Sequence, residues 1–244
     1  MDEFLNYIYS QVDFDKDFIY RELSFINIPN NEMNYYSKSG YGKNVKPLFD
    51  NIADKCNQRE SVVFPNGYWL LMISKHFFKM NDKYIKLYLP VKYSNIVNTV
   101  SDMINFLDDE QIPHNSKLAS EIRNDNFIIR LNFDDKDRVN DILEFVEDSN
   151  YERTSFNKVS PFLPSIDNVG IMIEDGYSYN SELARIILDY LKTCAWNKSQ
   201  SVSKEDLKDY IEYLNSNNFV DKYTYETFMS AYYQEKTKNL ILNK

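Results

Sequence analysis

The spacing of apolar residues along the chain predicts alternating strands and helices. Residues 84–100, YIKLYLPVKYSNIVNTV, begin with a strict alternation and continue with apolar positions three and four residues apart. Alternation of period two indicates a strand, whereas the longer spacing indicates an amphipathic helix. We therefore predict a strand over residues 83–91 and a helix from an N-cap at Ser94 to about Asp109.

A second unit of the same kind follows directly. Residues 116–122 and 126–133 alternate as two strands joined by a turn at Asn124 and Asp125, and residues 136–148 return to helical spacing. The order strand, helix, strand, strand, helix is typical of a layered fold. It predicts an α+β protein with a mainly antiparallel sheet covered by helices.

Helical spacing also opens the chain, with one or two helices expected in residues 2–27. The polar stretch NIPNNEMNYYSKSGYGKN that follows is rich in Asn, Ser and Gly and predicts a loop. Residues 46–55 predict a helix, and the turn at residues 65–67 leads into YWLLMIS. That run is apolar enough for a central strand.

The last third of the chain combines an irregular strand with helices. Residues 162–175 follow Pro161 directly and hold Pro164 and the apolar segment GIMI, which predicts an irregular strand close to the sheet. Three helices are expected after it, beginning at Ser178 or Ser181, at a capping box on Ser203, and at Thr224. We predict a helical segment with a loop over residues 1–44, an α+β domain over 45–193, and a helical pair over 194–244 that packs on this domain or on a partner.

The charge of the chain limits its partners. It has 28 Lys and Arg against 37 Asp and Glu, a net charge of −9, which repels nucleic acids and anionic lipids at long range. The acidic start MDEFLNYIYSQVDF is not typical of a signal peptide, and no apolar run approaches the roughly 20 residues that span a bilayer. We expect no nucleic acid and no membrane as partner, and a cytoplasmic protein that is secreted into a host only if it is an effector.

Residues that bind metals and organic cofactors are scarce. The chain has two His and two Cys, without CxxC spacing, and five Gly without a phosphate-binding loop pattern. The acidic runs DDEQ and DDKD lie at helix boundaries and lack the spacing of a calcium loop. We expect no metal site, no cofactor and two buried free thiols.

Basic residues gather in the predicted strands. Lys86 and Tyr88 share one face of their strand, which is either the solvated face of an antiparallel sheet or the floor of a cleft. The segment KLASEIRNDNFIIRLNF adds Lys117, Arg123 and Arg130, a local positive cluster in an acidic protein. The alternative is that these cations form surface salt bridges with Glu121, Asp125 or Asp134.

The order and spacing of these features resemble the HopA-type effector family of type III secretion, whose lyase-like relatives act in class V lanthipeptide biosynthesis. That family shows a strand with a basic-x-aromatic pattern, a helix, a Pro, a Lys between apolar residues, an Arg, and then a strand and a helix. Here these are Lys86 and Tyr88, Pro113, Lys117, Arg123, FIIRLNF and RVNDILEFV. The segments LFDNIADKCN, NGYWLLMI and FNKVSPFLPSIDNVGIMIEDGYSYNSELARIILDYL are also similar, so the resemblance covers roughly residues 45–193.

The resemblance implies elimination of phosphate from phosphoserine or phosphothreonine in a precursor peptide that a separate kinase-like protein has phosphorylated. It implies no metal and no organic cofactor.

Lys117 matches the base for the α-proton and must be neutral to act. Tyr88 is the implied acid, and His114 in PHNSK replaces it only if its loop folds back; the commoner role of a lone His is structural. Phosphate would be held by Lys86, Arg123, Arg130 and Arg185.

Two departures from the family pattern favour an alternative. The more distant phosphothreonine lyases have His where Tyr88 lies, and a phenol is a weaker acid at neutral pH than imidazolium. Leu183 stands where the family helix often begins with Arg, and Arg185 two residues later faces elsewhere. The chain is therefore either a lyase or a catalytically silent module of the same fold, which binds a peptide or protein or acts as a bacterial or phage effector. The last helix packs on the body or on a second subunit of a homo-oligomer.

Overall fold

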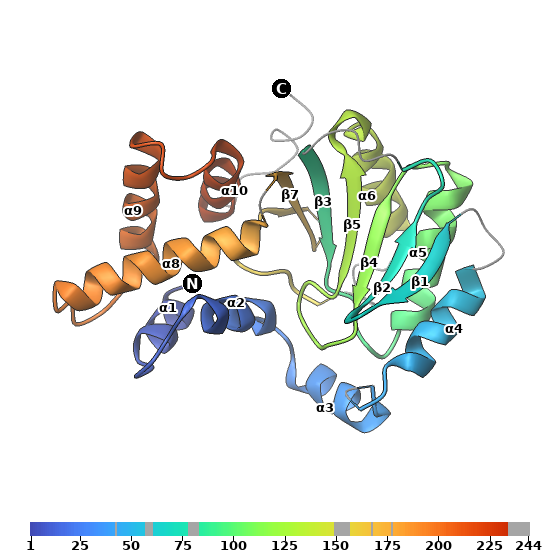
Figure 1. Ribbon diagram of the computed structural model, residues 1–244, viewed down its shortest axis with the longest axis horizontal. Coiled ribbons are helices and arrows are strands. Elements are labelled where there is room, and N and C mark those ends of the chain that lie inside the picture. The colour runs from blue at the N-terminus through green and yellow to red at the C-terminus, as the bar shows by residue number, and fades with distance from the viewer. Residues whose placement is uncertain are drawn as a thin grey trace.

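A seven-stranded antiparallel sheet lies at the centre of the computed structural model (Figure 1). The structure describes residues 1–41, 43–56, 61–77, 83–148, 157–166, 168–176 and 178–233. Within these ranges the strand order is β1-β2-β4-β5-β3-β7-β6. The strands are β1 Val62–Asn66, β2 Trp69–Ile73, β3 Lys83–Leu89, β4 Asn115–Ala119, β5 Phe127–Asn132, β6 Ser165–Ile166 and β7 Val169–Asp175.

Helices precede, interrupt and follow the strands. They are α1 Asp2–Tyr9, α2 Lys16–Phe25, α3 Asn30–Ser39, α4 Lys46–Cys56, α5 Ile96–Asp109, α6 Arg138–Asp148, α8 Tyr179–Trp196, α9 Lys204–Ser216 and α10 Lys222–Tyr233, with a short 3-10 turn at Phe133–Asp135. The predicted α+β class, with helices at both ends, is confirmed. Residues 234–244 of the predicted C-terminal pair lie outside the described residues, and the predicted domain boundaries stay predictions.

One face of the sheet packs against α4, α5 and α6. The alternate residues Ile85, Leu87 and Leu89 of β3 are fully buried there against the apolar stripes of these helices, which include Ile104 of α5 and Ile142 of α6. A period of two in the strand thus meets a period of 3.6 in the helices.

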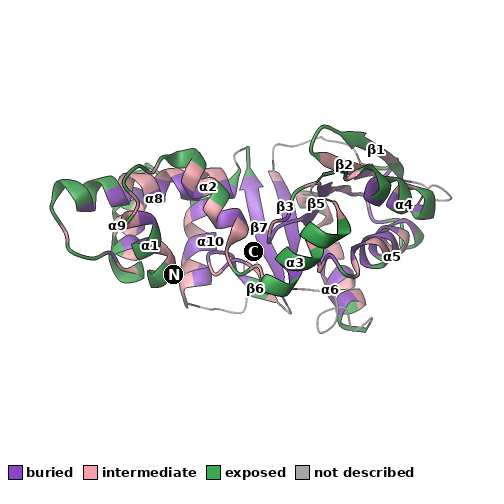
Figure 2. Cartoon of the chain, turned by 90° about the horizontal axis from the view of Figure 1, so that it is seen from below, coloured by how far each residue is buried: buried purple, intermediate pink, exposed green. Residues whose placement is uncertain are grey.

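The opposite face is covered only over part of its width. Tyr88, Ile128 and Met172 form a second core with the helices at the two ends of the chain, which gather on the β7 side of the sheet (Figure 1). Figure 2 shows β3 and β7 as buried, whereas β1 is largely exposed. The Lys86 and Tyr88 side of β3 is therefore not the solvated face that was one expectation, since these residues are only 5% and 3% exposed.

The segment predicted as a loop before residue 44 forms the helix α3. Its Asn and Ser content is typical of loops, but Glu32 in the first turn accepts a hydrogen bond of 2.7 Å from the backbone N–H of Tyr93. Tyr36 packs edge-on against Tyr93, with ring centroids 4.9 Å apart. Gly40, with φ of 79°, takes the left-handed conformation that ends many helices. Contacts with a distant segment thus stabilise a helix that local composition does not favour.

Two expected strands lie elsewhere in the sheet than predicted. YWLLMIS contains β2, which is second from the edge of the sheet and not central. The edge strand beside it is β1, which the sequence did not predict. The irregular strand expected in residues 162–175 is the short β6 followed by the regular β7, which pairs along its length with β3. Both differences come from long-range strand pairing, which local periodicity does not report.

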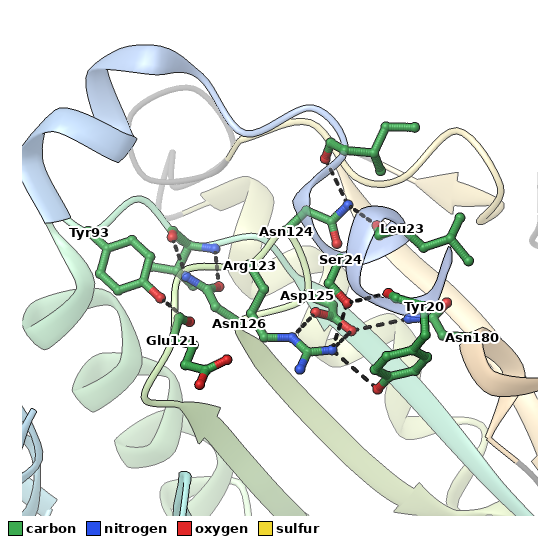
Figure 3. Close-up of polar contacts among 12 residues, drawn as sticks. Tyr20, Leu23, Ser24, Tyr93, Glu121, Arg123, Asn124, Asp125, Asn126 and Asn180 are labelled. Carbon is green, nitrogen blue, oxygen red and sulfur yellow. Dashed lines mark hydrogen bonds and ion pairs between the residues drawn. The ribbon is translucent and has the colours of Figure 1, made fainter. Parts of the chain in front are cut away.

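Residues 120–126, between β4 and β5, connect the sheet to the terminal helices (Figure 3). The side-chain amide of Asn124 donates to the backbone carbonyls of Leu23 and Ile26, at 3.1 and 2.8 Å. Asn126 binds both backbone groups of Val91, accepting from its N–H at 2.9 Å and donating to its carbonyl at 2.7 Å. Two buried amides therefore fix this turn between strands.

Replacing Asn126 by Ala should lower the free energy of unfolding by about 2–4 kcal/mol, because both backbone groups of Val91 lose a buried partner. Urea denaturation followed by circular dichroism measures this. Asn66→Ala, at an exposed position of β1, is the control and should change stability by less than about 0.5 kcal/mol. Equal stability of the two variants would contradict the account of this turn.

Candidate functional site

Two rows of side chains run across the partly covered face of the sheet. In an antiparallel sheet, residues opposite each other on neighbouring strands point to the same face. The first row is Phe64, Leu71, Lys117, Ile128, Tyr88 and Gly170. The second row is Val62, Ile73, Asn115, Arg130, Lys86 and Met172. The register therefore places Lys117, Arg130 and Lys86 on adjacent strands of one face.

Lys117 and Arg130 line the same cavity, which has a volume of about 270 Å³. The remaining lining residues are Trp69, Leu71, Asn115 and Ile128. The Lys117 ammonium lies 4.0 Å from the ring centroid of Trp69, and the Arg130 guanidinium lies 4.8 Å from that of Tyr84. Aromatic faces attract cations without neutralising them. Within the described residues neither cation forms an ion pair with a carboxylate, so both charges remain directed at the cavity.

The ammonium of Lys117 is easier to deprotonate than that of an ordinary lysine. Its pKa is lowered from 10.5 to about 8, first by burial and then by the charges of Lys86, Arg130 and Arg123, while Asp125 opposes them. Burial disfavours the charged form, and neighbouring cations act in the same direction. A substantial fraction of this amine is therefore neutral at slightly alkaline pH.

Lys86, the third cation of the face, is already paired. It forms a buried ion pair with Glu174 of β7. The other carboxylate oxygen of Glu174 accepts from the backbone N–H of Tyr179 at 3.2 Å, in the first turn of α8. Burial lowers the pKa of Lys86, and the attraction of Glu174 opposes this shift. Lys86 thus lies next to Arg130 in the second row, but its charge is paired with Glu174 and is not open to a ligand.

Arg123 is held by a carboxylate as well (Figure 3). Its guanidinium donates to both oxygens of Asp125, at 2.5 and 3.0 Å, and to the hydroxyl of Ser24 at 3.1 Å. Asn180 of α8 donates to the same carboxylate at 3.2 Å. The carboxylate of Asp125 raises the pKa of Arg123 above its ordinary value, against the effect of burial. The expected alternative of pairing with Asp125 is therefore correct for Arg123, although the pair is largely buried and not on the surface.

Arg123 borders a second cavity, of about 320 Å³, which it shares with Tyr20, Tyr68, Trp69, Ala119 and Glu121. Its guanidinium lies 5.4 Å from the ring centroid of Trp69. The same indole contacts Lys117 and lines the first cavity. Trp69 thus lines both cavities and contacts a cation from each.

Tyr88 does not reach the first cavity. Its hydroxyl donates to the sulfur of Met172 at 3.3 Å in the second core. Burial, reinforced by the charge of Glu174, raises the pKa of Tyr88 well above its ordinary value. The phenol is therefore a poor proton donor at neutral pH, and its implied role as the acid receives no support from its position.

His114 lies on the opposite face of the sheet and is fully buried. Its Nδ1 is 2.9 Å from the hydroxyl of Ser116, and its Nε2 is 3.0 Å from the hydroxyl of Ser61. Ser61 donates to Asp108 at 2.7 Å, so it accepts from His114 Nε2–H, and Nδ1 accepts from Ser116. Ser116 is paired with Ile129, which belongs to the core under α5. The structural alternative is therefore the correct one for this His.

Arg185 is remote from the two rows as well. It lies on α8 and pairs with Glu182 and Asp189 of the same helix, at 2.6 and 2.8 Å. Its guanidinium also donates to the backbone carbonyl of Phe219 at 3.3 Å.

The structure brings Lys117 and Arg130 to one cavity, buries Lys86 and Tyr88 beside it, and places Arg123 at the next cavity. Arg185 and His114 belong to other parts of the fold.

Three residues of the site were not singled out from the sequence. Glu174 follows Gly170 and Met172 in the alternation GIMIED, which places all three on one face, but only the pairing of β7 with β3 brings it to Lys86. Trp69 was interpreted as part of an apolar strand, and Tyr20 as part of a helix.

In the part of the chain that the structure describes, no group of three His, Cys, Asp or Glu is placed to hold a metal ion. No helix there is long and apolar enough to cross a membrane.

Comparisons with known proteins give a fold but no sequence family. No family model matches the chain, and no curated protein matches its sequence. An effector protein from Pseudomonas syringae pv. tomato strain DC3000 superposes with a TM-score of 0.59 at 11% identity, over 93% of this chain and 94% of that one. The chain shares its fold with this effector protein. An effector protein from Pseudomonas syringae pv. syringae strain 61 superposes with a TM-score of 0.55 at 11% identity, over 86% and 90% of the two chains.

The amine of Lys117 should titrate near pH 8, which nuclear magnetic resonance of lysines labelled at the ε carbon measures directly. Arg130→Gln should raise this pKa, because it removes a neighbouring positive charge. Arg185→Gln on α8 is the matched control and should leave the titration unchanged. A Lys117 pKa at the ordinary lysine value of 10.5 would contradict the described environment.

Lys117→Met should stabilise the protein at about pH 7, by about 1–3 kcal/mol. The pKa of this amine is lower in the folded state than in the unfolded chain. At any pH below about 8 the amine is protonated in both states, and its buried charge lowers the free energy of unfolding. The unfolded chain binds the extra proton between about pH 8 and 10.5, and stability rises with pH across that window. The gain from Lys117→Met should therefore vanish near pH 10.5, whereas Lys158→Met at an exposed site should change stability at neither pH.

Proposed function

We propose that this protein is a phosphoserine/phosphothreonine lyase-like protein that eliminates phosphate from a phosphorylated peptide and leaves a dehydroamino acid. The observation that carries the proposal is the cavity in which Lys117, with a pKa of about 8, lies beside Arg130. Neither is held by a carboxylate of the described chain. The HopA-type sequence resemblance supports the same proposal, and the fold shared with effector proteins supports a role as an effector.

The elimination needs a base and a site for the departing phosphate. The neutral amine of Lys117 takes the α-proton, the electrons of the Cα–H bond form the Cα=Cβ double bond, and the Cβ–O bond breaks. The phosphate leaves with the electron pair of that bond. Arg130 faces the same cavity and offers a guanidinium fork, which suits phosphate oxygens.

The leaving phosphate receives no proton from Tyr88 in this proposal, because that phenol is buried against Met172. Positive charge takes its place. Arg130 contacts the phosphate directly, while the charge of Lys86, its neighbour in the second row, is paired with Glu174. Preorganised charge of this kind is often the largest contribution to catalysis. The resemblance implies that Lys86 and Arg123 are phosphate ligands. In this proposal they are supporting residues instead.

A specific observation favours a second candidate function. Three of the four implied phosphate ligands, Lys86, Arg123 and Arg185, are already paired with carboxylates. A site in which most of the implied charge is neutralised is adequate for binding a phosphorylated peptide but weaker for turnover. The second candidate is therefore a catalytically silent binding module, which acts as a bacterial or phage effector or recruits a precursor peptide for a kinase-like partner.

Incubation of the purified protein with a synthetic phosphothreonine peptide separates the two. For a lyase, mass spectrometry should show loss of one phosphoric acid, at a rate that increases with pH as Lys117 deprotonates. Lys117→Ala should lower this rate by at least about 100-fold, and Arg130→Gln by at least about tenfold. Arg185→Gln, a variant of an arginine outside the cavity, should retain the activity.

Binding without product from the wild-type protein would establish the silent module and reject the lyase. Absence of both product and phosphate-dependent binding would reject both candidates. Product formation that survives Lys117→Ala would reject the assigned base while retaining the reaction.

A further inference from the structure

Four apolar side chains form an open surface beside the cationic cavity, on β1 and β2 at one edge of the sheet. Val62 and Phe64 of β1 are 53% and 39% exposed. Leu71 and Ile73 of β2 are half-buried on the same face. We call these four residues the apolar shelf.

The apolar shelf has no role in the cores of the described fold. The other face of β2 supplies Leu70 and Met72 to the core, where they are 1% and 0% exposed. An antiparallel edge hairpin with one buried face normally carries polar residues on the other. Here both faces are apolar, and an exposed contiguous apolar patch is typical of a binding surface.

The shelf continues directly into the cavity. Leu71 is paired with Phe64 on one side and with Lys117 on the other, and it lines the cavity itself. Ile73 lies next to Asn115, which is paired with Arg130. A single ligand can therefore place an anionic group at the two cations and an apolar group on the shelf.

The spacing of the strands sets the size of such a ligand. Neighbouring strands lie about 4.8 Å apart, so Leu71 and Phe64 are one and two strand spacings from Lys117, about 5 and 10 Å. An extended peptide advances about 3.3 Å per residue. An apolar side chain one to three residues from a phosphorylated residue would reach the shelf.

The ligand lies on the face of the sheet and does not extend its edge. Pro65 in the middle of β1 has no backbone N–H, and proline on an edge strand prevents continuous pairing with an added strand. A ligand of the shelf therefore contacts its side chains and does not pair with the backbone of β1 as an added strand.

We infer that the substrate is a peptide with a large apolar residue, such as Leu or Phe, one to three positions from the phosphoserine or phosphothreonine, and that the apolar shelf selects it. This inference rests on the proposed function, because the anion at Lys117 and Arg130 is taken to be the phosphate of that residue. Charge complementarity and the unbroken register from shelf to cavity carry it.

The test uses four fluorescent peptides of one sequence. Two carry a phosphonate in place of the phosphate ester of threonine, which cannot be eliminated, and two carry unmodified threonine; in each pair, the residue two positions away is Leu or Ser. Fluorescence anisotropy should show the wild-type protein binding the Leu phosphonate peptide about tenfold more tightly than the Ser phosphonate peptide. Phe64→Ser and Val62→Ser should each reduce this preference to about twofold or less.

Phe219→Ser is the matched control, because Phe219 is 61% exposed and lies in the connection between α9 and α10. It should keep the full preference, and circular dichroism should show all three variants folded. Equal binding of the two phosphonate peptides by the wild-type protein would overturn the shelf assignment while leaving the phosphate site intact. A Leu preference that needs Phe64 but no phosphonate would instead overturn the phosphate site.

Self-association is the competing occupant of the shelf. Sedimentation velocity of the wild-type protein without peptide should give a monomer. A dimer that Phe64→Ser dissociates would assign the shelf to a second copy of the chain and overturn the peptide proposal.

Discussion

The antiparallel register of β2, β4, β5 and β3 is the constraint on which the site depends. Lys117, Arg130 and Lys86 come from three strands, and only this register places them next to one another on one face. Cations that are close together and partly buried are unfavourable, because they repel one another and lose water. The fold must therefore compensate some of this charge, and the distribution of the compensation defines the site.

The compensation is uneven. Glu174 pairs with the deeply buried Lys86, and Asp125 holds Arg123, while Lys117 and Arg130 receive aromatic faces instead. Both carboxylates also bind α8, through the N–H of Tyr179 and the amide of Asn180. The helices at the ends of the chain thus help to hold the charges in place. Among the cations that the structure describes on this face, Lys117 and Arg130 have no carboxylate partner, and these two line the cavity to which the apolar surface leads.

Much of the fold was predictable from periodicity, because helices such as α5 bury one apolar stripe and strands such as β3 carry apolar side chains at alternate positions. The positive cluster was also predictable, since Lys117 and Arg130 lie in two predicted strands that follow each other in the sequence. What local sequence could not provide was strand order. The pairing of β7 with β3 decides that Glu174 neutralises Lys86, and the packing of α2 and α8 decides that Asp125 is buried with Arg123. His114 shows the same limit, because only the fold distinguishes a buried structural imidazole from a catalytic one.

The most direct measurement is a crystal structure with the phosphonate peptide bound. The account predicts phosphonate oxygens within hydrogen-bond distance of both Lys117 Nζ and the Arg130 guanidinium, with Glu174 still on Lys86 and Asp125 still on Arg123. A phosphonate bound at Arg123 after displacement of Asp125, or bound away from the sheet altogether, would contradict it.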